Sequence, residues 1–242
     1  MKSLWDHGLW LFPVSGGLMV GEQFHAGRRC TCVDFSARPS KEVAMSRRGK
    51  YIAIEGWEAS GKSTQARLLA DRLDAVLTRE PGGTDLGVAI RGLLLGNGPE
   101  PTQRAEALLF AADRAQHLAE VVEPALSEGR DVITDRSYGS TLAYQGHGRG
   151  QPIDELMRLA EWASGGLLPD LVVLLTVPAD TADRRLGEER DRMEREDTDF
   201  AARVIEGFAA LADADPDRWV VVDGTGSIEE VAEKVASAVG AK

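Results

Sequence analysis

The fold of this 242-residue chain is decided by residues 51–64, which read YIAIEGWEASGKST. The first residues are largely apolar and β-forming, as is typical of a buried strand. From Gly56 to Ser63 the chain matches G-x-x-x-x-G-K-[ST] at every fixed position, and residues 64–73 then carry apolar side chains at helical spacing. A strand, a glycine-rich loop and a helix therefore follow one another in the order that this phosphate-binding motif requires.

The chemistry of the motif follows from its residue types. Glycines let successive backbone N–H groups face a phosphate, and the start of a helix adds partial positive charge. We expect Lys62 to reach the β- and γ-phosphates and the Ser63 hydroxyl to contact Mg²⁺. The sequence thus predicts a nucleoside-triphosphate site. The expected ATP-binding residues are Gly56, Trp57, Glu58, Ala59, Ser60, Gly61, Lys62, Ser63 and Thr64.

The composition of the whole chain narrows the class of protein. Its length suits one α/β domain with room for an appendage. Acidic residues outnumber basic ones by 39 to 28, a net charge of −11, which argues against a nucleic-acid-binding surface. No apolar run approaches the ~20 residues of a membrane span. Two neighbouring cysteines, Cys30 and Cys32, exclude a disulfide-stapled scaffold and favour the reducing cytoplasm.

Residues 1–46 read differently from the rest of the chain. They hold two of the five tryptophans and scattered glycine and proline, with no sustained hydrophobic period. They also lack the basic start and small-residue cleavage site of a signal peptide. We expect a poorly ordered leader over 1–46 and a nucleotide-binding α/β domain over 47–242. Met45 lies just ahead of the first predicted strand, so the working protein is expected to start near it.

Strands and helices alternate after residue 50. The predicted strands are 51–54, 75–78, 131–134, 171–176 and 218–222, and the predicted helices include 104–120, 153–164, 181–188, 200–212 and 228–239. This alternation predicts an α/β three-layer sandwich in which helices flank a five-stranded parallel sheet. Substrates of such sheets gather at the carboxyl ends of the strands.

Two of these strands end in charged residues. The second delivers Arg79 and Glu80 ahead of a Pro-Gly-Gly turn, and the third delivers Asp135 and Arg136. An acidic residue in the latter place commonly holds Mg²⁺ in proteins with a phosphate-binding loop, and an arginine fork suits a second phosphate. The alternatives are an ordinary surface turn at the first site, and a helix cap with a structural partner at the second.

Two helical segments leave their interpretation open. Phe110 and Arg114 lie four residues apart and share one helix face, where they are able to stack a base and bond its edge. Spacing alone favours core packing for Phe110 and a surface ion pair for Arg114. We expect His117 to be a solvated helix residue and His147 a loop residue. Residues 183–197, rich in arginine, are either a solvated mixed-charge face or a lid that closes over phosphates.

Taken together, the motifs resemble the bacterial thymidylate kinase family, which phosphorylates dTMP to dTDP with ATP and Mg²⁺. The resemblance spans about residues 50–239. It rests on the phosphate-binding loop, on residues 78–84, 108–117 and 135–146, and on the sequence DRME at 191–194. It implies homodimers, as is general for such kinases. The chain departs from the family pattern at Trp57, which is bulkier than expected, and in its first 45 residues.

The resemblance also implies a function for particular residues. Phe110 would stack on thymine, Arg114 would bond its edge, and Thr141 would lie beside the base. Tyr144, followed by Gln145, would lie under the sugar and disfavour a ribose 2′-hydroxyl.

For the acceptor phosphate, the resemblance implies Arg79 and Arg136. Glu80 and Asp135 would organise metal, water and arginines around it, and Glu58 would lie near the sugar and phosphate.

The phosphate-binding loop carries no arginine, so the resemblance implies that a lid arginine assists catalysis, with Arg185 and Arg190 as candidates. Lys62, Glu58, Arg136 and these two arginines form the expected catalytic set, and Ser63 and Asp135 the metal site. Two other interpretations stay open: a kinase for another nucleotide or nucleoside, and a nucleotide-binding regulatory module without turnover.

Overall fold

The computed structural model describes residues 9–14, 17–22, 48–185, 192–193 and 195–241. The chain divides into two compact units, residues 1–45 and 46–242. In the first unit, strands β1 (Leu9–Val14) and β2 (Gly17–Glu22) pair antiparallel as a hairpin. The sequence pattern did not predict these strands, because Pro13 and Gly17 interrupt their apolar run.

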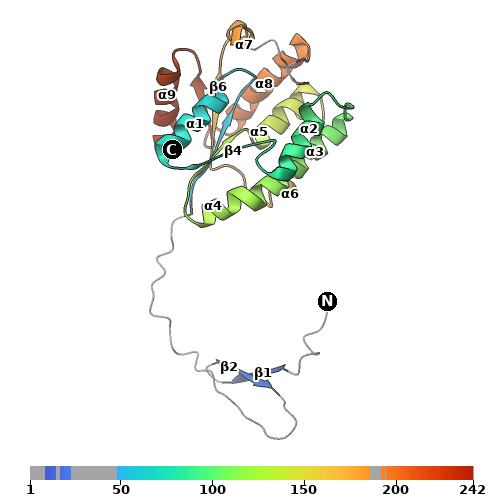
Figure 1. Ribbon diagram of the computed structural model, residues 1–242, viewed down its shortest axis with the longest axis vertical. Helices are drawn as coiled ribbons and strands as arrows, with labels where there is room; N and C mark the ends of the chain where they lie inside the picture. The colour runs from blue at the N-terminus through green and yellow to red at the C-terminus, as the bar shows by residue number, and fades with distance from the viewer. Residues whose placement is uncertain (1–8, 15–16, 23–47, 186–191, 194, 242) are drawn as a thin grey trace. The chain divides into compact units, whose positions relative to one another are not determined.

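The second unit is a five-stranded parallel sheet with helices on both faces (Figure 1), which confirms the predicted fold class. The strands lie in the order β4-β5-β3-β6-β7. Their bounds are β3 Tyr51–Glu55, β4 Val76–Arg79, β5 Val132–Asp135, β6 Leu171–Thr176 and β7 Trp219–Asp223. Each bound lies within one residue of the prediction.

The helices connect these strands. They are α1 Lys62–Leu73, α2 Asp85–Leu95, α3 Gln103–His117, α4 Glu123–Ser127, α5 Tyr138–Thr141, α6 Ile153–Ala163, α7 Ala179–Arg185, α8 Thr198–Ala214 and α9 Ile228–Gly240. Two π-helical segments, Leu118–Val122 and Leu142–Gly148, continue α3 and α5. His147 therefore lies in a helix, and its prediction as a loop residue was wrong, since the glycines around it are tolerated in this helical segment.

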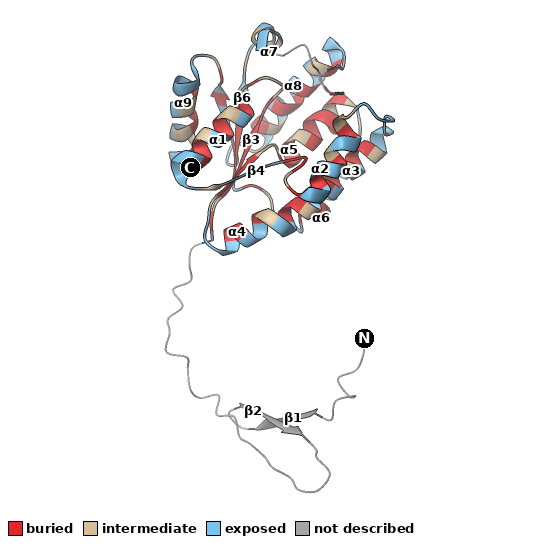
Figure 2. Ribbon diagram, viewed as in Figure 1, coloured by how far each residue is buried: buried red, intermediate tan, exposed pale blue. Residues whose placement is uncertain are grey.

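The strand β3 shows how the sheet separates two cores. Its alternating side chains point to opposite faces of the sheet. Ile52 and Ile54 pack with apolar residues of α1 and α9, which lie side by side in Figure 1. Ala53 packs on the other face, with residues of α5, α6 and α8. Figure 2 shows that burial concentrates on the sheet and on the inner sides of the helices.

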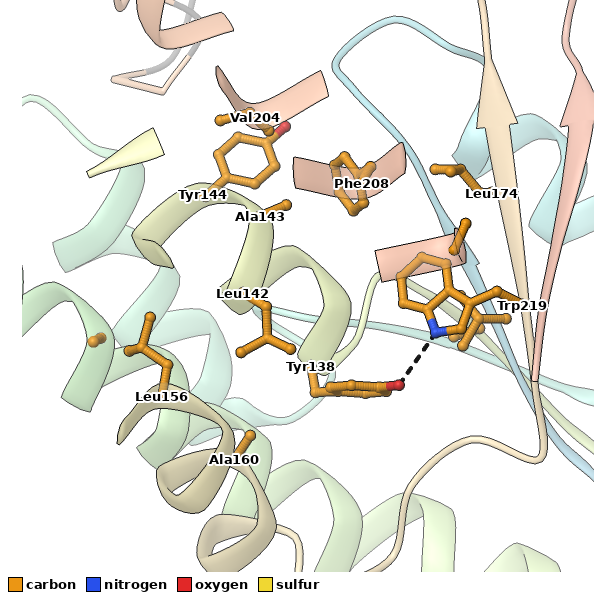
Figure 3. Packing of buried hydrophobic residues seen from close by; sticks show 14 of the residues in the cluster. Tyr138, Leu142, Ala143, Tyr144, Leu156, Ala160, Leu174, Val204, Phe208 and Trp219 are labelled. Carbon is orange, nitrogen blue, oxygen red and sulfur yellow. Dashed lines mark hydrogen bonds between the residues drawn. The ribbon is translucent and has the colours of Figure 1, made fainter. Parts of the chain in front are cut away.

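The second core is built around aromatic residues. Tyr138 and Trp219 meet edge-on, and the indole Nε1 donates a hydrogen bond of 3.3 Å to the Tyr138 hydroxyl (Figure 3). Tyr144 meets Phe208 edge-on in the same core, with ring centroids 6.1 Å apart. This packing fixes the segment 138–148 beneath the carboxyl ends of β3 and β5. Of the helices in the described part of the chain, none is long and apolar enough to cross a membrane.

Candidate active site

Three cavities follow one another along the carboxyl ends of the strands. We call them the α9 cavity, the P-loop cavity and the α3 cavity. The first two share Gly61, Thr64 and Arg185 as lining residues. The last two share Glu58 and Arg136. The cavities therefore form one cleft, with the phosphate-binding loop at its centre.

The loop between β3 and α1 has the conformation that its glycines permit. Gly56 has φ +145°, and a Cβ there would come within 2.4 Å of the Leu175 carbonyl oxygen. Gly61 has φ +98° and directly precedes the first residue of α1, Lys62. The backbone thus turns sharply and presents the N-terminal end of a twelve-residue helix to the P-loop cavity.

Lys62 is buried and has its charge near the centre of the cleft. Its Nζ donates a 2.7 Å hydrogen bond to the Trp57 carbonyl oxygen. Burial, together with the charge of Arg136, lowers the pKa of Lys62 to about 8, while Glu58 acts in the opposite direction. This ammonium group lines the P-loop cavity, where the sequence predicts phosphates.

Ser63 and Asp135 come together as the metal prediction requires. The Ser63 hydroxyl donates a hydrogen bond to Asp135 Oδ2. The second oxygen of the carboxylate, Oδ1, is buried and has no hydrogen-bond partner among the described residues. A buried carboxylate oxygen without a partner, beside a hydroxyl, fits a hard divalent cation such as Mg²⁺.

Arg136 is the most connected cation of the site. Its guanidinium donates to the Gly56 carbonyl oxygen at 3.2 Å, to Ser140 Oγ at 3.0 Å and to the Tyr144 hydroxyl at 3.2 Å, and it pairs with Glu58. The backbone φ of Arg136 is +74°, a left-handed conformation that is strained for a side chain of this size. Strain of this kind persists where surrounding contacts fix the residue, and here they aim its side chain into the cleft.

Glu58 and Tyr144 complete this group. The Tyr144 hydroxyl donates a 2.8 Å hydrogen bond to Glu58 Oε1. Burial alone would raise the pKa of Glu58, but Arg136 and Lys62 outweigh it and lower the pKa to about 2. Burial raises the pKa of Tyr144 well above its ordinary value, so its hydroxyl keeps the proton that it donates. Glu58 is therefore a carboxylate held between two cations.

Glu80 lies at the end of β4 in a buried clamp. Arg114 Nε donates to Glu80 Oε2 at 2.9 Å, and His117 Nδ1 lies 2.9 Å from Glu80 Oε1. The other ring nitrogen of His117 is 2.7 Å from the Thr78 hydroxyl. Although burial opposes it, the charge of Arg114 and the hydrogen bond with His117 hold the pKa of Glu80 below its usual value.

Two sequence predictions on α3 are thereby corrected. His117 is 0% exposed instead of solvated, and Arg114 forms a buried ion pair instead of a surface pair. Both errors have one cause: β4 brings Glu80 against this face of α3, a contact that no local spacing reveals. The signal available was that residues 110, 114 and 117 share one helix face, which is too polar for a simple core contact.

The α3 cavity combines an aromatic side chain with buried polar groups. Phe110 lines one wall and packs on the aromatic core. Arg114 Nη2 donates to Thr141 Oγ1 at 3.0 Å, while Arg114 Nη1 is buried without a partner among the described residues. Gln145 also lines the cavity and donates to Glu106 Oε1 at 2.9 Å. A free guanidinium N–H beside an aromatic wall suits the edge of a base.

Besides Arg136, two predicted arginines line the P-loop cavity. Arg79, at the end of β4, and Arg185, at the end of α7, both line it. Arg185 also lines the α9 cavity and donates to the Gly224 carbonyl oxygen at 3.4 Å. Arg190 lies outside the described residues. Further along the predicted lid, Arg192 is buried and pairs with Glu106 at 2.8 Å, and Met193 lines the α3 cavity.

Sequence reasoning missed two buried carboxylates that support the site. Glu55 Oε1 accepts hydrogen bonds from the backbone N–H groups of Ser137 and Ser140, each at 2.9 Å. Glu106 ties Gln145 to Arg192. A charged residue at the end of a strand that is otherwise apolar was the available signal for Glu55. Nothing in the spacing of α3 singles out Glu106.

Comparison with known proteins agrees with this geometry. A sequence model of the family "Thymidylate kinase" matches residues 54–235. A thymidylate kinase of Leifsonia xyli subsp. xyli is 48% identical over 201 residues, covering 80% of this chain and 95% of its own. One of Gloeobacter violaceus is 50% identical over 198 residues, covering 78% and 93%.

A solved structure is also similar. The crystal structure of thymidylate kinase from Ehrlichia chaffeensis superposes with a TM-score of 0.68 at 31% identity, covering 80% of this chain and 99% of the other. A family match over most of the domain, relatives at nearly half identity and a shared fold lead to one conclusion. The chain belongs to the thymidylate kinase family.

Proposed function

We propose that this protein transfers the γ-phosphoryl group of ATP to dTMP, giving dTDP and ADP. The observation that carries the proposal is the single cleft, which offers a nucleoside cavity at each end and the phosphate-binding loop between them. Two nucleotides that meet head to head would fill such a cleft, with their phosphates in the middle.

The donor occupies the α9 and P-loop cavities in this proposal. Adenosine lies by Gly224 and Ser227, and the triphosphate extends along residues 56–64 to Lys62. Ser63 and Asp135 would hold Mg²⁺, which supplies charge neutralisation for the phosphates when bound. Arg185 lines both cavities, so we assign to Arg185 the stabilisation of the phosphoryl group during its transfer. Arg190 is the second candidate in the lid.

The acceptor occupies the α3 cavity. Phe110 stacks on the thymine, and the free Nη1 of Arg114 meets a carbonyl oxygen at its edge, beside Thr141 and Gln145. The Tyr144 hydroxyl lies next to Glu58 and marks the sugar end of the pocket.

The acceptor phosphate in this proposal lies where the α3 and P-loop cavities meet. Arg136 lines both cavities and Arg79 lines the P-loop cavity, so both guanidinium groups are placed to bind this phosphate.

The chemistry needs charge neutralisation and alignment, with no general base. The second pKa of a phosphomonoester is about 6, so the attacking phosphate is mostly a dianion at neutral pH. Two anions must approach in line, and the moving phosphoryl group spreads its charge over three oxygens. Lys62, Arg136 and Arg185 place positive charge on both sides of the transfer. Glu58, whose pKa is about 2, orients Arg136 and does not serve as a base.

We also propose that the protein is a homodimer in the cytoplasm. In each subunit the domain of residues 47–242 carries the activity and does not need the leader, residues 1–46. Helices α2 and α3 expose Leu86, Leu93 and Leu108 to 51, 59 and 58%, an apolar surface suited to a second copy of this chain. Light scattering on the purified protein tests the dimer. Leu93→Glu together with Leu108→Glu should give a monomer, and a monomeric unsubstituted protein would overturn the assignment.

The test of the reaction is an acceptor panel. ADP release with ATP and Mg²⁺ is coupled to a detection system and measured with dTMP, dUMP, dCMP, dGMP, UMP and thymidine in parallel. The proposal expects strong turnover on dTMP and little on UMP or thymidine. Best turnover on another acceptor would assign a different nucleotide kinase, and tight ATP binding with no turnover would assign a regulatory module.

A further inference from the structure

The side chain of Trp57, in the phosphate-binding loop, has no part in the proposed reaction. Its backbone carbonyl accepts the hydrogen bond of Lys62 on the donor side. Trp57 is not among the described residues that line the α3 cavity. It instead stacks on Tyr144, with ring centroids 5.6 Å apart and an angle of 17° between the planes.

The Tyr144 ring is in contact with three groups besides the indole. Phe200 and Phe208 meet its edge at interplanar angles of 62° and 80°. The Arg136 guanidinium lies 5.1 Å from its ring centroid. Trp57 is the only partner of these that lies parallel to the ring, and Figure 3 shows Tyr144 beside Phe208 in the same core. A stacked aromatic pair is a favoured geometry, so the indole adds to the contacts that hold the tilt of the Tyr144 ring.

The tilt matters because the Tyr144 hydroxyl is the polar tip of this ring. It donates to Glu58 Oε1 at 2.8 Å and accepts from Arg136 Nη2 at 3.2 Å. Glu58 directly follows Trp57, so one dipeptide places both the ring and the acceptor of its hydroxyl. A small apolar residue at position 57 would leave Glu58 in place and remove the surface that orients the ring.

We propose that Trp57 is a positioning residue that sets the sugar specificity of the acceptor site through Tyr144. The proposal rests on the proposed function, in which Tyr144 marks the sugar end of the dTMP pocket. A ring held in one tilt presents a fixed edge to carbon 2′ of the sugar and excludes a hydroxyl there. Without the indole, the Tyr144 ring is able to shift, and the site then accepts a ribonucleotide.

The experiment compares dTMP with 5-methyluridine 5′-monophosphate, which differs from it only by the 2′-hydroxyl. The ratio of their kcat/KM values is measured for the wild type, Trp57→Leu and Trp57→Phe. Since an aromatic pair contributes about 0.5–1.5 kcal/mol, Trp57→Leu should lower the ratio by about twofold to twelvefold. Trp57→Phe keeps a ring in the stack and should stay within about twofold of the wild type.

Two controls separate this effect from a loss of structure. In a Tyr144→Leu background, Trp57→Leu should not change the sugar ratio further, because the ring that the indole orients is gone. Trp57→Met, which fills much of the same space without a ring, serves if Trp57→Leu does not fold. An equal loss on both acceptors or an unchanged ratio would overturn the proposal. A wild type that does not use dTMP would instead overturn the proposed function.

Discussion

Arg114→Met tests whether the buried clamp on Glu80 is both a structural and a functional element. The side chains of Arg114 and Glu80 are each only 4% exposed, and their atoms Nε and Oε2 lie 2.9 Å apart. Methionine keeps the aliphatic stem and removes the charge. Breaking a buried pair while leaving one charge uncompensated costs about 3–5 kcal/mol. We expect a loss of about 3 kcal/mol in the free energy of unfolding, because His117 still contacts Oε1.

The assay is urea unfolding followed by circular dichroism, with Arg158→Met as the matched control. Arg158 pairs with Asp154 on the surface of α6, where their side chains are 70% and 75% exposed. An exposed pair of this kind contributes about 0.5 kcal/mol or less. For a domain of this size, the loss expected for Arg114→Met corresponds to a fall in Tm of roughly 6–12 °C. The double variant Glu80→Gln, Arg114→Met should recover part of the lost stability, because it leaves no unpaired charge in the clamp.

The pH dependence supplies a second check. The pKa of Glu80 is lowered in the folded protein, so the clamp stabilises fully above the pKa of a free glutamate, about 4.3. Its contribution is lost as the pH falls below that value. The stability gap between the wild type and Arg114→Met should therefore narrow from pH 7 to pH 3. If Arg114→Met is as stable as Arg158→Met, or if the stability gap does not depend on pH, the clamp does not stabilise the fold.

Three further predictions concern the cleft and the leader. ATP affinity should fall as the pH rises above about 8, where Lys62 loses its proton, and titration of a fluorescent ATP analogue should show no such fall in Lys62→Met. Arg185→Ala should lower kcat by about 10²-fold or more, while Arg184→Ala, whose guanidinium pairs with exposed Asp180, should stay within about twofold in the same steady-state assay. Removing residues 1–44, so that the chain starts at Met45, should leave kcat/KM for dTMP within about twofold, and a larger loss would assign the leader a function.

The sequence predicted well what is encoded locally. The phosphate-binding loop, its strand and its helix are defined by contiguous residues, and the structure places Lys62 and Ser63 in the cleft as expected. The strand bounds followed from short apolar runs in the same way. The resemblance to the family added the α3 cavity, whose lining includes Phe110 and Tyr144.

What the sequence did not predict depends on contacts between distant elements. His117 is buried because β4 brings Glu80 to the same face of α3, 37 residues away in the chain. Glu55 supports Ser137 and Ser140 across the gap between β3 and α5, more than 80 residues apart. The helical segment at 138–148 escaped prediction because its glycines and polar residues read as a loop. Tertiary packing outweighs local propensity at each of these places.

The most direct test of the account is the fate of the γ-phosphoryl group. ATP labelled at the γ-phosphate is incubated with the protein, Mg²⁺ and dTMP, and the products are separated. The account predicts that the label appears in dTDP, one for each ADP formed, and that Lys62→Met abolishes the transfer. Label released as inorganic phosphate, or retained on the protein, would contradict direct transfer between two nucleotides in one cleft.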